Sequence, residues 1–318
     1  MAEVPVTLAL GHYDRHMPFF DGTIAIDGVA LTLINVDSVE RHNRMLNDGA
    51  YDVAELSLSS YLVARDRGLP FTAVPVFPRR LFSQSNMYRN LGAGIESPQD
   101  LVGRRVGLSS YQTTLCVLAK GDLHHEYGVP WKEIRWVVGR EQAVEADLPA
   151  DLKLDVVPRG ANLSDMLAQG DIAALLVSRT PRCFLDRDAR VARLFSQPRD
   201  EEAAYFRRNG FFPIMHVLTF KDETLREHPW LGAAFLDAFN RALIECGRHW
   251  EDPNWSRLAW GQQYLDEEIA LMGRDPWANG VKANRANIER FVEYSHEQGL
   301  ISRRLRLEEL FAPPTLET

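Results

Sequence analysis

The sequence lacks the features that define several large classes of protein. It has only three cysteines, Cys116, Cys183 and Cys246, and they are widely spaced. This argues against a disulfide framework and against a zinc site built from cysteine pairs, so we expect reduced, mostly buried thiols. No apolar run is long enough to cross a bilayer, and the first residues lack the pattern of a secretory signal peptide. The sequence therefore predicts a cytoplasmic protein with no membrane partner.

Basic charge and several catalytic motifs are also missing. The formal net charge is -8, which argues against non-specific binding to nucleic acid. The chain has no GxGxxG, no phosphate-loop lysine motif and no GxSxG, so it does not look like a nucleotide-binding enzyme or a serine hydrolase. His124 and His125 are adjacent on a predicted helix, which places them on different faces, and neither has a partner at the spacing of a metalloprotease helix. We find no dedicated metal motif.

What is present is an α/β pattern that starts twice. The chain has 318 residues, of which 45% are hydrophobic, and is long enough for two cores. Strands alternate with helices up to about residue 77, the alternation restarts at Pro98, and long helices dominate after about residue 220. Such an insertion predicts a two-lobed α/β clamp with two crossovers and a helical C-terminal part. We predict one lobe over 1–89 and 217–318, and the other over 90–216.

Two strand-to-helix turns carry unusually many hydroxyl groups. One turn covers residues 52–61 and the other covers residues 104–115. The first N–H groups of a helix lie at the positive end of its dipole, so an anion there is favoured by roughly 0.3–1 kcal/mol. Ligands of open α/β sheets bind beyond the carboxyl ends of strands, so the two turns are expected to face each other across a cleft. The alternative is that the hydroxyl groups only cap their helices.

A set of short motifs, in this order, resembles the 4,5-dihydroxyphthalate decarboxylase family over nearly the whole chain. The motifs are Tyr13-Asp14-Arg15, Asp21-Gly22, Glu55 to Tyr61, Pro75 to Arg80, Tyr111-Gln112-Thr113, Phe212 to His216 and Tyr294 to Leu300. The family is similar in fold to type II periplasmic binding proteins. The resemblance implies a carboxy-lyase that converts a hydroxylated aromatic acid, foremost 4,5-dihydroxyphthalate to protocatechuate, by ring protonation in the cleft between the lobes, without a cofactor.

The chemistry implied by the resemblance needs an acid near the ring carbon and an acceptor near the phenol. His216 is the first candidate for proton transfer, because it lies in an apolar strand and an imidazole titrates near neutrality. The alternative for His216 is a histidine of the core. Glu55 is expected to pair with His216 or to accept the phenolic proton, unless it caps a helix or forms a structural ion pair. Asp14 is a third candidate, with pairing to Arg15 as its alternative.

Arginine is the residue type that best holds the remaining carboxylate, because its guanidinium can donate two parallel hydrogen bonds. The candidates are Arg79, Arg80 and Arg179. Arg79 and Arg80 are adjacent in an extended segment, so only one of them is expected to point inward. The other predicted substrate-binding residues are His12, Tyr13, Arg15, Ser57, Ser59, Ser110, Tyr111, Gln112, Thr113 and Thr114. A divalent ion held by His12, Asp14, Glu55 and His216 stays open as an alternative.

The rival hypothesis is a cytoplasmic protein of the same fold that binds or senses a small carboxylate without turning it over, because fold alone does not give function. Release of carbon dioxide by the purified protein separates the two. In either case the expected partner is a small aromatic carboxylate, and neither nucleic acid nor a membrane. The apolar C-terminal helices are compatible with a homo-oligomer.

Overall fold

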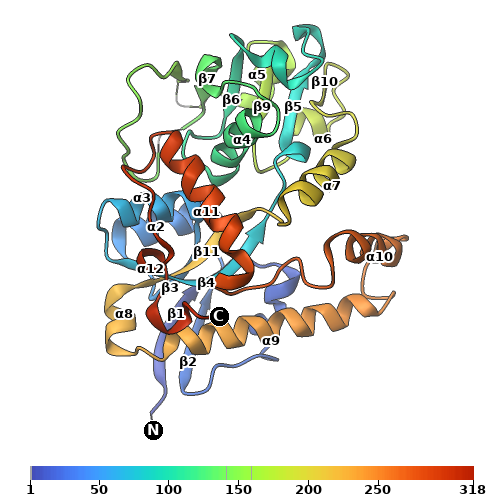
Figure 1. The fold of residues 1–318 in the computed structure, drawn as a ribbon. Helices are drawn as coiled ribbons and strands as arrows, with labels where there is room; N and C mark the ends of the chain where they lie inside the picture. Colours follow the sequence, from blue (N-terminus) through green and yellow to red (C-terminus); the bar gives the residue numbers. More distant parts are fainter. Residues whose placement is uncertain (1, 141, 159) are drawn as a thin grey trace. The chain divides into compact units, whose positions relative to one another are not determined.

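The computed structural model describes residues 2–140, 142–158 and 160–318 (Figure 1). The chain divides into two compact units. The first unit contains the N-terminal segment up to Arg80 together with Ile214–Glu289 and Leu305–Thr318. The second unit contains Leu81–Pro213 and Arg290–Arg304. Each unit is built on its own sheet, so the chain has the predicted α/β class with an inserted second unit.

The sheet of the first unit has five strands in the order β2-β1-β3-β11-β4. In chain order the strands are β1 (Val4–Ala9), β2 (Val29–Ile34), β3 (Val53–Ser57), β4 (Phe71–Arg80) and β11 (Ile214–Lys221). Strand β1 is parallel to β2 and β3, whereas β11 runs antiparallel to both β3 and β4. The carboxyl ends of β1, β3 and β4 therefore meet the beginning of β11 at one edge of the sheet.

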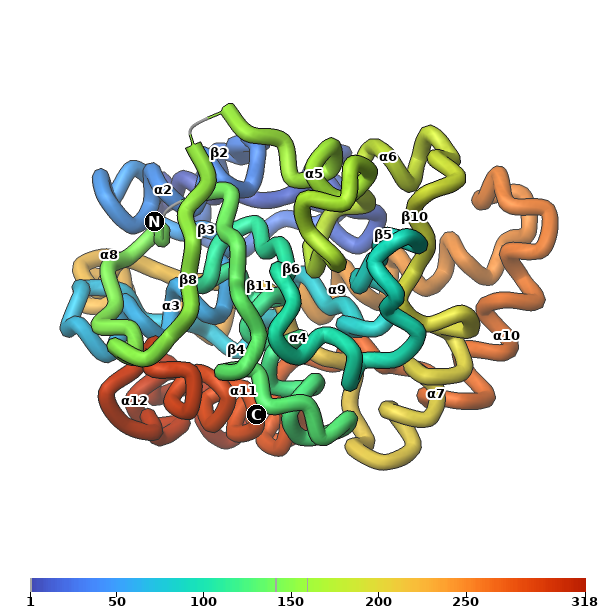
Figure 2. Tube along the Cα trace, turned by 90° about the horizontal axis from the view of Figure 1, so that it is seen from above, coloured from blue at the N-terminus to red at the C-terminus, as the bar shows by residue number. Residues whose placement is uncertain are grey.

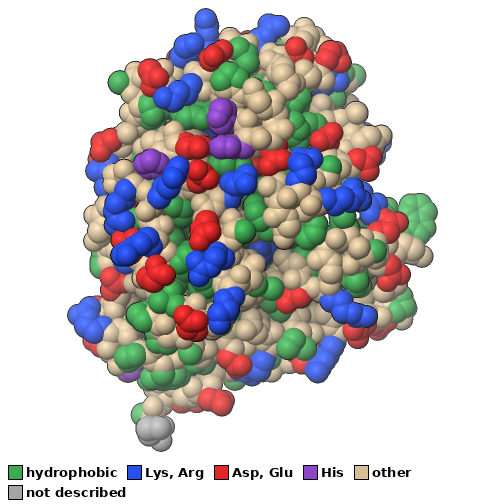
Figure 3. Space-filling model, in the orientation of Figure 1, with side chains coloured by type: hydrophobic (Ala, Val, Ile, Leu, Met, Phe, Trp, Pro, Cys, Tyr) green, Lys and Arg blue, Asp and Glu red, His purple; other side chains and the backbone are tan. Residues whose placement is uncertain are grey.

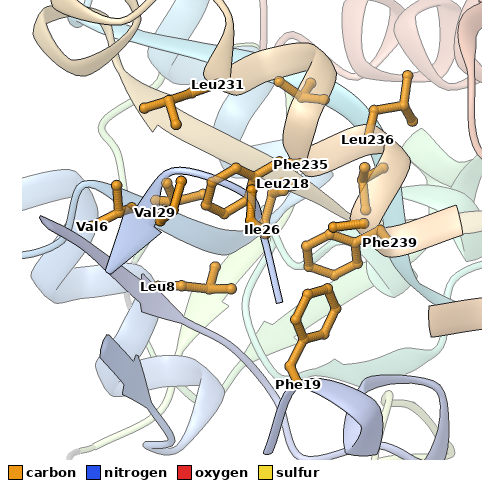
Figure 4. Packing of buried hydrophobic residues seen from close by; sticks show 14 of the residues in the cluster. Val6, Leu8, Phe19, Ile26, Val29, Leu218, Leu231, Phe235, Leu236 and Phe239 are labelled. Carbon is orange, nitrogen blue, oxygen red and sulfur yellow. The ribbon is translucent and has the colours of Figure 1, made fainter. Parts of the chain in front are cut away.

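Helices cover this sheet and supply most of its core. They are α1 (Met17–Phe20), α2 (Ser38–Asp48), α3 (Leu58–Asp66), α8 (Asp222–Glu227), α9 (Leu231–Glu251), α10 (Gly261–Met272), the first part of α11 (Val281–Glu297) and α12 (Leu307–Leu310). Figure 4 shows the apolar stripe of α9, with Phe235 and Phe239, lying over Leu8 and Leu218 of the sheet. Burying a phenylalanine in this way stabilises the fold by about 1.5–3 kcal/mol.

The second unit is a six-stranded sheet in the order β10-β5-β9-β6-β7-β8. Its strands are β5 (Met87–Asn90), β6 (Arg105–Leu108), β7 (Arg135–Val138), β8 (Leu154–Val156), β9 (Ala174–Leu176) and β10 (Val191–Arg193). Its helices are α4 (Thr114–His125), α5 (Leu163–Gln169), α6 (Arg182–Leu185), α7 (Pro198–Asn209) and the second part of α11. The strands β8, β6, β5 and β10 follow one another across the view in Figure 2. Strand β5 is antiparallel to both β10 and β9, whereas β9 with β6, β6 with β7 and β7 with β8 pair in parallel, so this sheet is also mixed.

The unit boundaries differ from the predicted lobes in one important respect. Residues 290–304, which we assigned to the first lobe, belong to the second unit. The reason is hydrogen bonding to α4: Gln298 Nε2 donates to the carbonyl oxygen of Val117 at 2.9 Å, and Tyr111 Oη donates to that of Gln298 at 3.2 Å. The first two crossovers lie at 80/81 and 213/214, nine and three residues before the predicted ones.

Two surface properties bear on the predicted partners. On the face drawn in Figure 3, basic and acidic side chains are interspersed, and no field of a single sign covers it. Within the described residues, no helix is both long and apolar enough to cross a membrane.

The contact between α4 and α11 gives a test of the packing in the second unit. A Cβ atom at Gly121 would lie 2.1–2.4 Å from ring atoms of the buried Tyr294, whereas one at Gly247 in α9 would meet nothing within 4 Å. We expect Gly121→Ala to lower the free energy of unfolding by about 1–3 kcal/mol through overpacking. Gly247→Ala, the matched control, should raise it by about 0.4–1 kcal/mol. Urea unfolding measures both, and equal effects of the two substitutions would contradict this packing.

Candidate active site

The carboxylate of Glu55 is the centre of a buried polar cluster at the edge where β1, β3 and β11 meet. Its Oε2 atom accepts a hydrogen bond from the backbone N–H of Gly11 at 2.8 Å and forms an ion pair with Arg41 Nη2, also at 2.8 Å. Its Oε1 atom accepts from Tyr13 Oη at 3.3 Å and contacts Nδ1 of His216. The side chain of Glu55 is fully buried. One carboxylate thus joins the segment after β1, helix α2 and strand β11.

Local structure explains why these groups reach Glu55. Arg41 lies on the buried face of α2 together with Met45, and its Nε also donates to the backbone oxygen of Glu55 at 3.1 Å. Gly11 lies two residues after the end of β1, and a Cβ atom there would lie 2.7 Å from the ring of Tyr13 and 2.9 Å from Glu55 Oε2. Only glycine therefore lets the backbone donate to the carboxylate while the Tyr13 ring lies against it.

The protonation states follow from burial and charge. Burial opposes ionisation of Glu55, but attraction by Arg41 and then by His216 outweighs it and holds the pKa of Glu55 well below its usual range. Burial lowers the pKa of His216 to about 4, with attraction by Glu55 only partly opposing the shift. The resting pair is therefore a carboxylate and a neutral imidazole. Because the carboxylate can only accept, Nδ1 of His216 carries the proton and Nε2 is the basic nitrogen.

Strand register places further groups around His216. Ser57 on β3 and Arg79 on β4 are its partners in the sheet, and the pairing of β11 with β4 is irregular on both sides of His216. The positive charge of Arg79 lowers the pKa of His216 and also that of Tyr13, although burial leaves the pKa of Tyr13 raised overall. The ring of His42 meets the ring of His216 edge to face, with centroids 5.0 Å apart.

Arg15 is held in an aromatic clamp beside this cluster. Its guanidinium lies 4.4 Å from the ring centroid of Tyr13 and 4.1 Å from that of Trp277, and its Nε donates to the carbonyl oxygen of Pro78 at 2.8 Å. Asp14 accepts from the backbone N–H of Arg15 at 2.8 Å and from Trp250 Nε1 at 3.0 Å. Asp14 therefore takes the alternative that we gave for it, since its hydrogen bonds go to Arg15 and Trp250.

Other predicted residues of the first unit have structural contacts. Arg80 is buried, and its Nη2 donates to Asn284 Oδ1 at 2.7 Å and to the carbonyl oxygen of Ala278. Ser57 caps helix α3 by accepting from the backbone N–H of Ser60. Ser59 is completely buried on the same helix.

The metal site that we left open is not assembled. Within the described ranges, no three His, Cys, Asp or Glu side chains form a group that could hold a metal ion. His12 is exposed and its ring packs edge to face on Phe20, 4.6 Å away. Asp14 is engaged with Arg15, so neither residue joins Glu55 and His216.

The predicted turn of the second unit forms a hydroxyl cluster of its own. The Oγ1 atom of Thr113, the residue that precedes α4, lies 3.1 Å from Ser109 Oγ and 2.8 Å from Ser110 Oγ. Thr114 is buried in the first turn of α4, and Arg179 is exposed after β9. An anion site at this turn stays a prediction.

Two residues of that turn have a different role from the one predicted. The side-chain amide of Gln112 bonds to both the backbone N–H and the carbonyl oxygen of Val144, at 3.1 and 2.9 Å. Tyr111 is completely buried, and its ring lies against the buried Lys120. Gln112 thus fixes the neighbouring loop and Tyr111 fills the core, so neither is placed as a polar lining residue.

Comparison with known proteins shows to which family the chain belongs. A 4,5-dihydroxyphthalate decarboxylase from Comamonas testosteroni is 36% identical over 327 residues, covering 100% of this chain and 99% of the relative. Another from Pseudomonas putida is 35% identical over 214 residues, covering 65% of this chain and 83% of the relative. The chain belongs to the 4,5-dihydroxyphthalate decarboxylase family. Residues 25–172 also match the family described as NMT1/THI5 like.

The fold of this decarboxylase-family chain extends to distant proteins. The periplasmic aliphatic sulphonate binding protein SsuA from Escherichia coli is 9% identical, with a TM-score of 0.57 and full coverage of both chains. At that identity the likeness concerns the fold alone. It identifies the two-lobed fold of periplasmic binding proteins that the motifs implied.

Three residues of the cluster were missed from the sequence: Arg41, His42 and His16. The usable signal for Arg41 was its place on the buried face of an amphipathic helix, where a charged residue needs a partner. His16 is buried, and its Nδ1 is hydrogen-bonded to the carbonyl oxygen of Gly11 at 2.8 Å. Burial, with repulsion by Arg15, lowers the pKa of His16 to about 4.

The buried neutral state of His16 predicts acid sensitivity. Its pKa is about 4 when folded and about 6.5 when unfolded, so only the unfolded chain gains this proton as pH falls between those values. The free energy of unfolding should therefore fall by about 2 kcal/mol between pH 7 and pH 5 on account of His16. In His16→Gln that part of the pH dependence should vanish. Urea unfolding at both pH values checks this, and an unchanged dependence in the variant would show that His16 has the same pKa in the folded and the unfolded chain.

Proposed function

We propose that this protein is a carboxy-lyase that decarboxylates 4,5-dihydroxyphthalate to protocatechuate without an added cofactor. The observation that carries the proposal is the buried pair of Glu55 and neutral His216 beside Arg79, in a chain of this family. A neutral imidazole held by a carboxylate is equipped to take a proton and to be stabilised once it is charged.

The reaction needs a proton to be moved within the substrate. Each carboxylate-bearing carbon of 4,5-dihydroxyphthalate has a hydroxyl group para to it. His216 Nε2 accepts the proton of that hydroxyl, and Glu55 stabilises the imidazolium that forms. The imidazolium then donates its proton to the ring carbon that bears the leaving carboxylate. When the carbon–carbon bond breaks, its electron pair returns to the ring and carbon dioxide leaves. The phenolate finally takes one proton from solvent, so each turnover consumes one proton.

This order refines the role expected from the sequence. We expected His216 to transfer the proton, and a histidine with a pKa of about 4 is neutral at neutral pH. It therefore starts as a base and becomes the acid only after it has taken the phenolic proton. Glu55 acts through His216 and accepts no proton itself, since its pKa is held low.

The charges near the pair suit a dianionic substrate. The positive charges of Arg15, Arg41 and Arg79 all act on Tyr13, against the single negative charge of Glu55. Arg41 is committed to Glu55, and Arg15 is held between two rings. Arg79, which is half-buried and next to His216, is thus our choice for the carboxylate that stays on the ring.

The role of His216 is tested by His216→Asn. The asparagine amide can still donate to Glu55, so the carboxylate is not stranded, but no basic nitrogen remains. We expect the turnover number to fall by about a hundredfold to ten-thousandfold, with substrate binding nearly unchanged. Carbon dioxide release and calorimetric titration measure the two effects, and His249→Asn on the exposed end of α9 is the control. A folded variant with normal turnover would remove His216 from the mechanism. A wild-type protein that binds the acid and releases no carbon dioxide would instead be a binding protein or sensor.

The role of Arg79 is tested by comparing Arg79→Met with Arg179→Met. A lost hydrogen bond between charged groups costs about 1.5–3 kcal/mol, so Arg79→Met should raise KM by roughly tenfold to a hundredfold. Arg179 is exposed in the second unit, and its replacement should leave KM within about twofold. Initial rates over a range of substrate concentrations decide the matter. A raised KM in Arg179→Met together with an unchanged KM in Arg79→Met would mean that Arg179, and not Arg79, binds the carboxylate.

A further inference from the structure

The proposed reaction consumes one proton per turnover, and the residues that would surround the reacting substrate are buried. Glu55 and Arg41 are at most 1% exposed, and His216 is 6% exposed. Each turnover leaves a phenolate beside a neutral imidazole, and the product leaves as the uncharged phenol only when a proton reaches this site from outside. A second titratable group that connects the surface to the buried pair would provide that proton.

His42 lies where such a group is needed. It follows Arg41 on α2, and its ring contacts the ring of His216 edge to face at 5.0 Å, with an angle of 83° between the ring planes. The side chain as a whole is half-buried, yet its Nε2 atom is shielded from solvent. The His42 side chain is therefore partly exposed and at the same time in contact with the ring of His216.

We propose that His42 carries protons from solvent to the site of His216, an inference that rests on the proposed decarboxylation. A solvent proton binds to one ring nitrogen of His42, and the other nitrogen releases a proton to the product phenolate, directly or through one water molecule. Only N–H and O–H bonds form and break, and His42 returns to its neutral state.

Burial and charge decide which group receives the proton that His42 releases. Burial and the positive charges of Arg41 and Arg79 lower the pKa of His216, and attraction by Glu55 opposes this only in part. The proton therefore goes to the product phenolate and not to His216. The remaining charged groups nearest along α2 are Glu40 and Arg44, which are exposed and lie 3.4 Å apart as an ion pair.

The structural alternative is that His42 only packs against His216. An edge-to-face pair of rings is worth about 0.5–1.5 kcal/mol, and phenylalanine would keep it. His42→Phe therefore preserves the packing and removes the proton carrier, while His42→Gln removes both. His249→Phe, on the exposed end of α9, is the matched control.

The test separates the first turnover from later ones. The first turnover uses the proton of the substrate's own hydroxyl, so rapid mixing of His42→Phe with 4,5-dihydroxyphthalate should release about one carbon dioxide per site at the wild-type rate. Later turnovers should be slower by roughly tenfold or more, and added imidazole should restore them without changing KM. Wild-type protein and His249→Phe should show neither the burst nor the response to imidazole.

Each other outcome overturns the inference. A normal steady rate in folded His42→Phe and His42→Gln would mean that protons reach the site without His42. An equal loss in the first and later turnovers, with no response to imidazole, would mean that His42 only positions His216. If His42→Phe does not fold, His42→Gln decides by the same measurements. If the wild-type protein releases no carbon dioxide, the proposed function itself is refuted. This outcome differs from failure of the His42 proposal, which shows only in the His42 variants.

Discussion

The structure of the first unit depends on how the charge of Glu55 is compensated. An ionised carboxylate cannot remain buried without partners, and Glu55 has a guanidinium, a backbone N–H, a phenol and an imidazole around it. These partners come from α2, from the segment after β1 and from β11, which are far apart in the sequence. Satisfying one charge therefore fixes the relative positions of three elements at the edge of the sheet.

The same compensation determines the chemistry available to His216. Arg41 keeps Glu55 ionised, an ionised Glu55 orients the imidazole through Nδ1, and burial keeps that imidazole neutral. Removing Arg41 or Glu55 would leave its partner as an uncompensated buried charge, which costs several kcal/mol. Losses caused by substituting either residue would thus mix folding with catalysis. His216 is the member of the group that can be exchanged for another donor with the least damage.

The sequence allowed the contact between Glu55 and His216 to be predicted. Both residues lie in family motifs, and the strands β3 and β11 that carry them are neighbours in the sheet. Arg79 and Arg80 could be separated in principle, since neighbours in an extended strand point to opposite sides, and Arg80 does turn toward Asn284. Arg41 and His42 were missed because their approach to β3 and β11 is set by the packing of α2 on the sheet, which no local motif encodes.

The polar turn before α4 could not be interpreted from the sequence alone. Hydroxyl and amide side chains at the start of a helix suggest a ligand-binding site, but the same groups can form hydrogen bonds with nearby groups of the protein itself. Gln112 uses both ends of its amide on Val144, and Thr113 bonds to Ser109 and Ser110. Whether a polar residue is available to a ligand depends on which distant backbone it meets. Glu55 is also engaged by the protein's own groups, but its carboxylate differs from the amide of Gln112 in its consequence. The negative charge that the partners of Glu55 stabilise also orients the imidazole of His216, which accepts the proton.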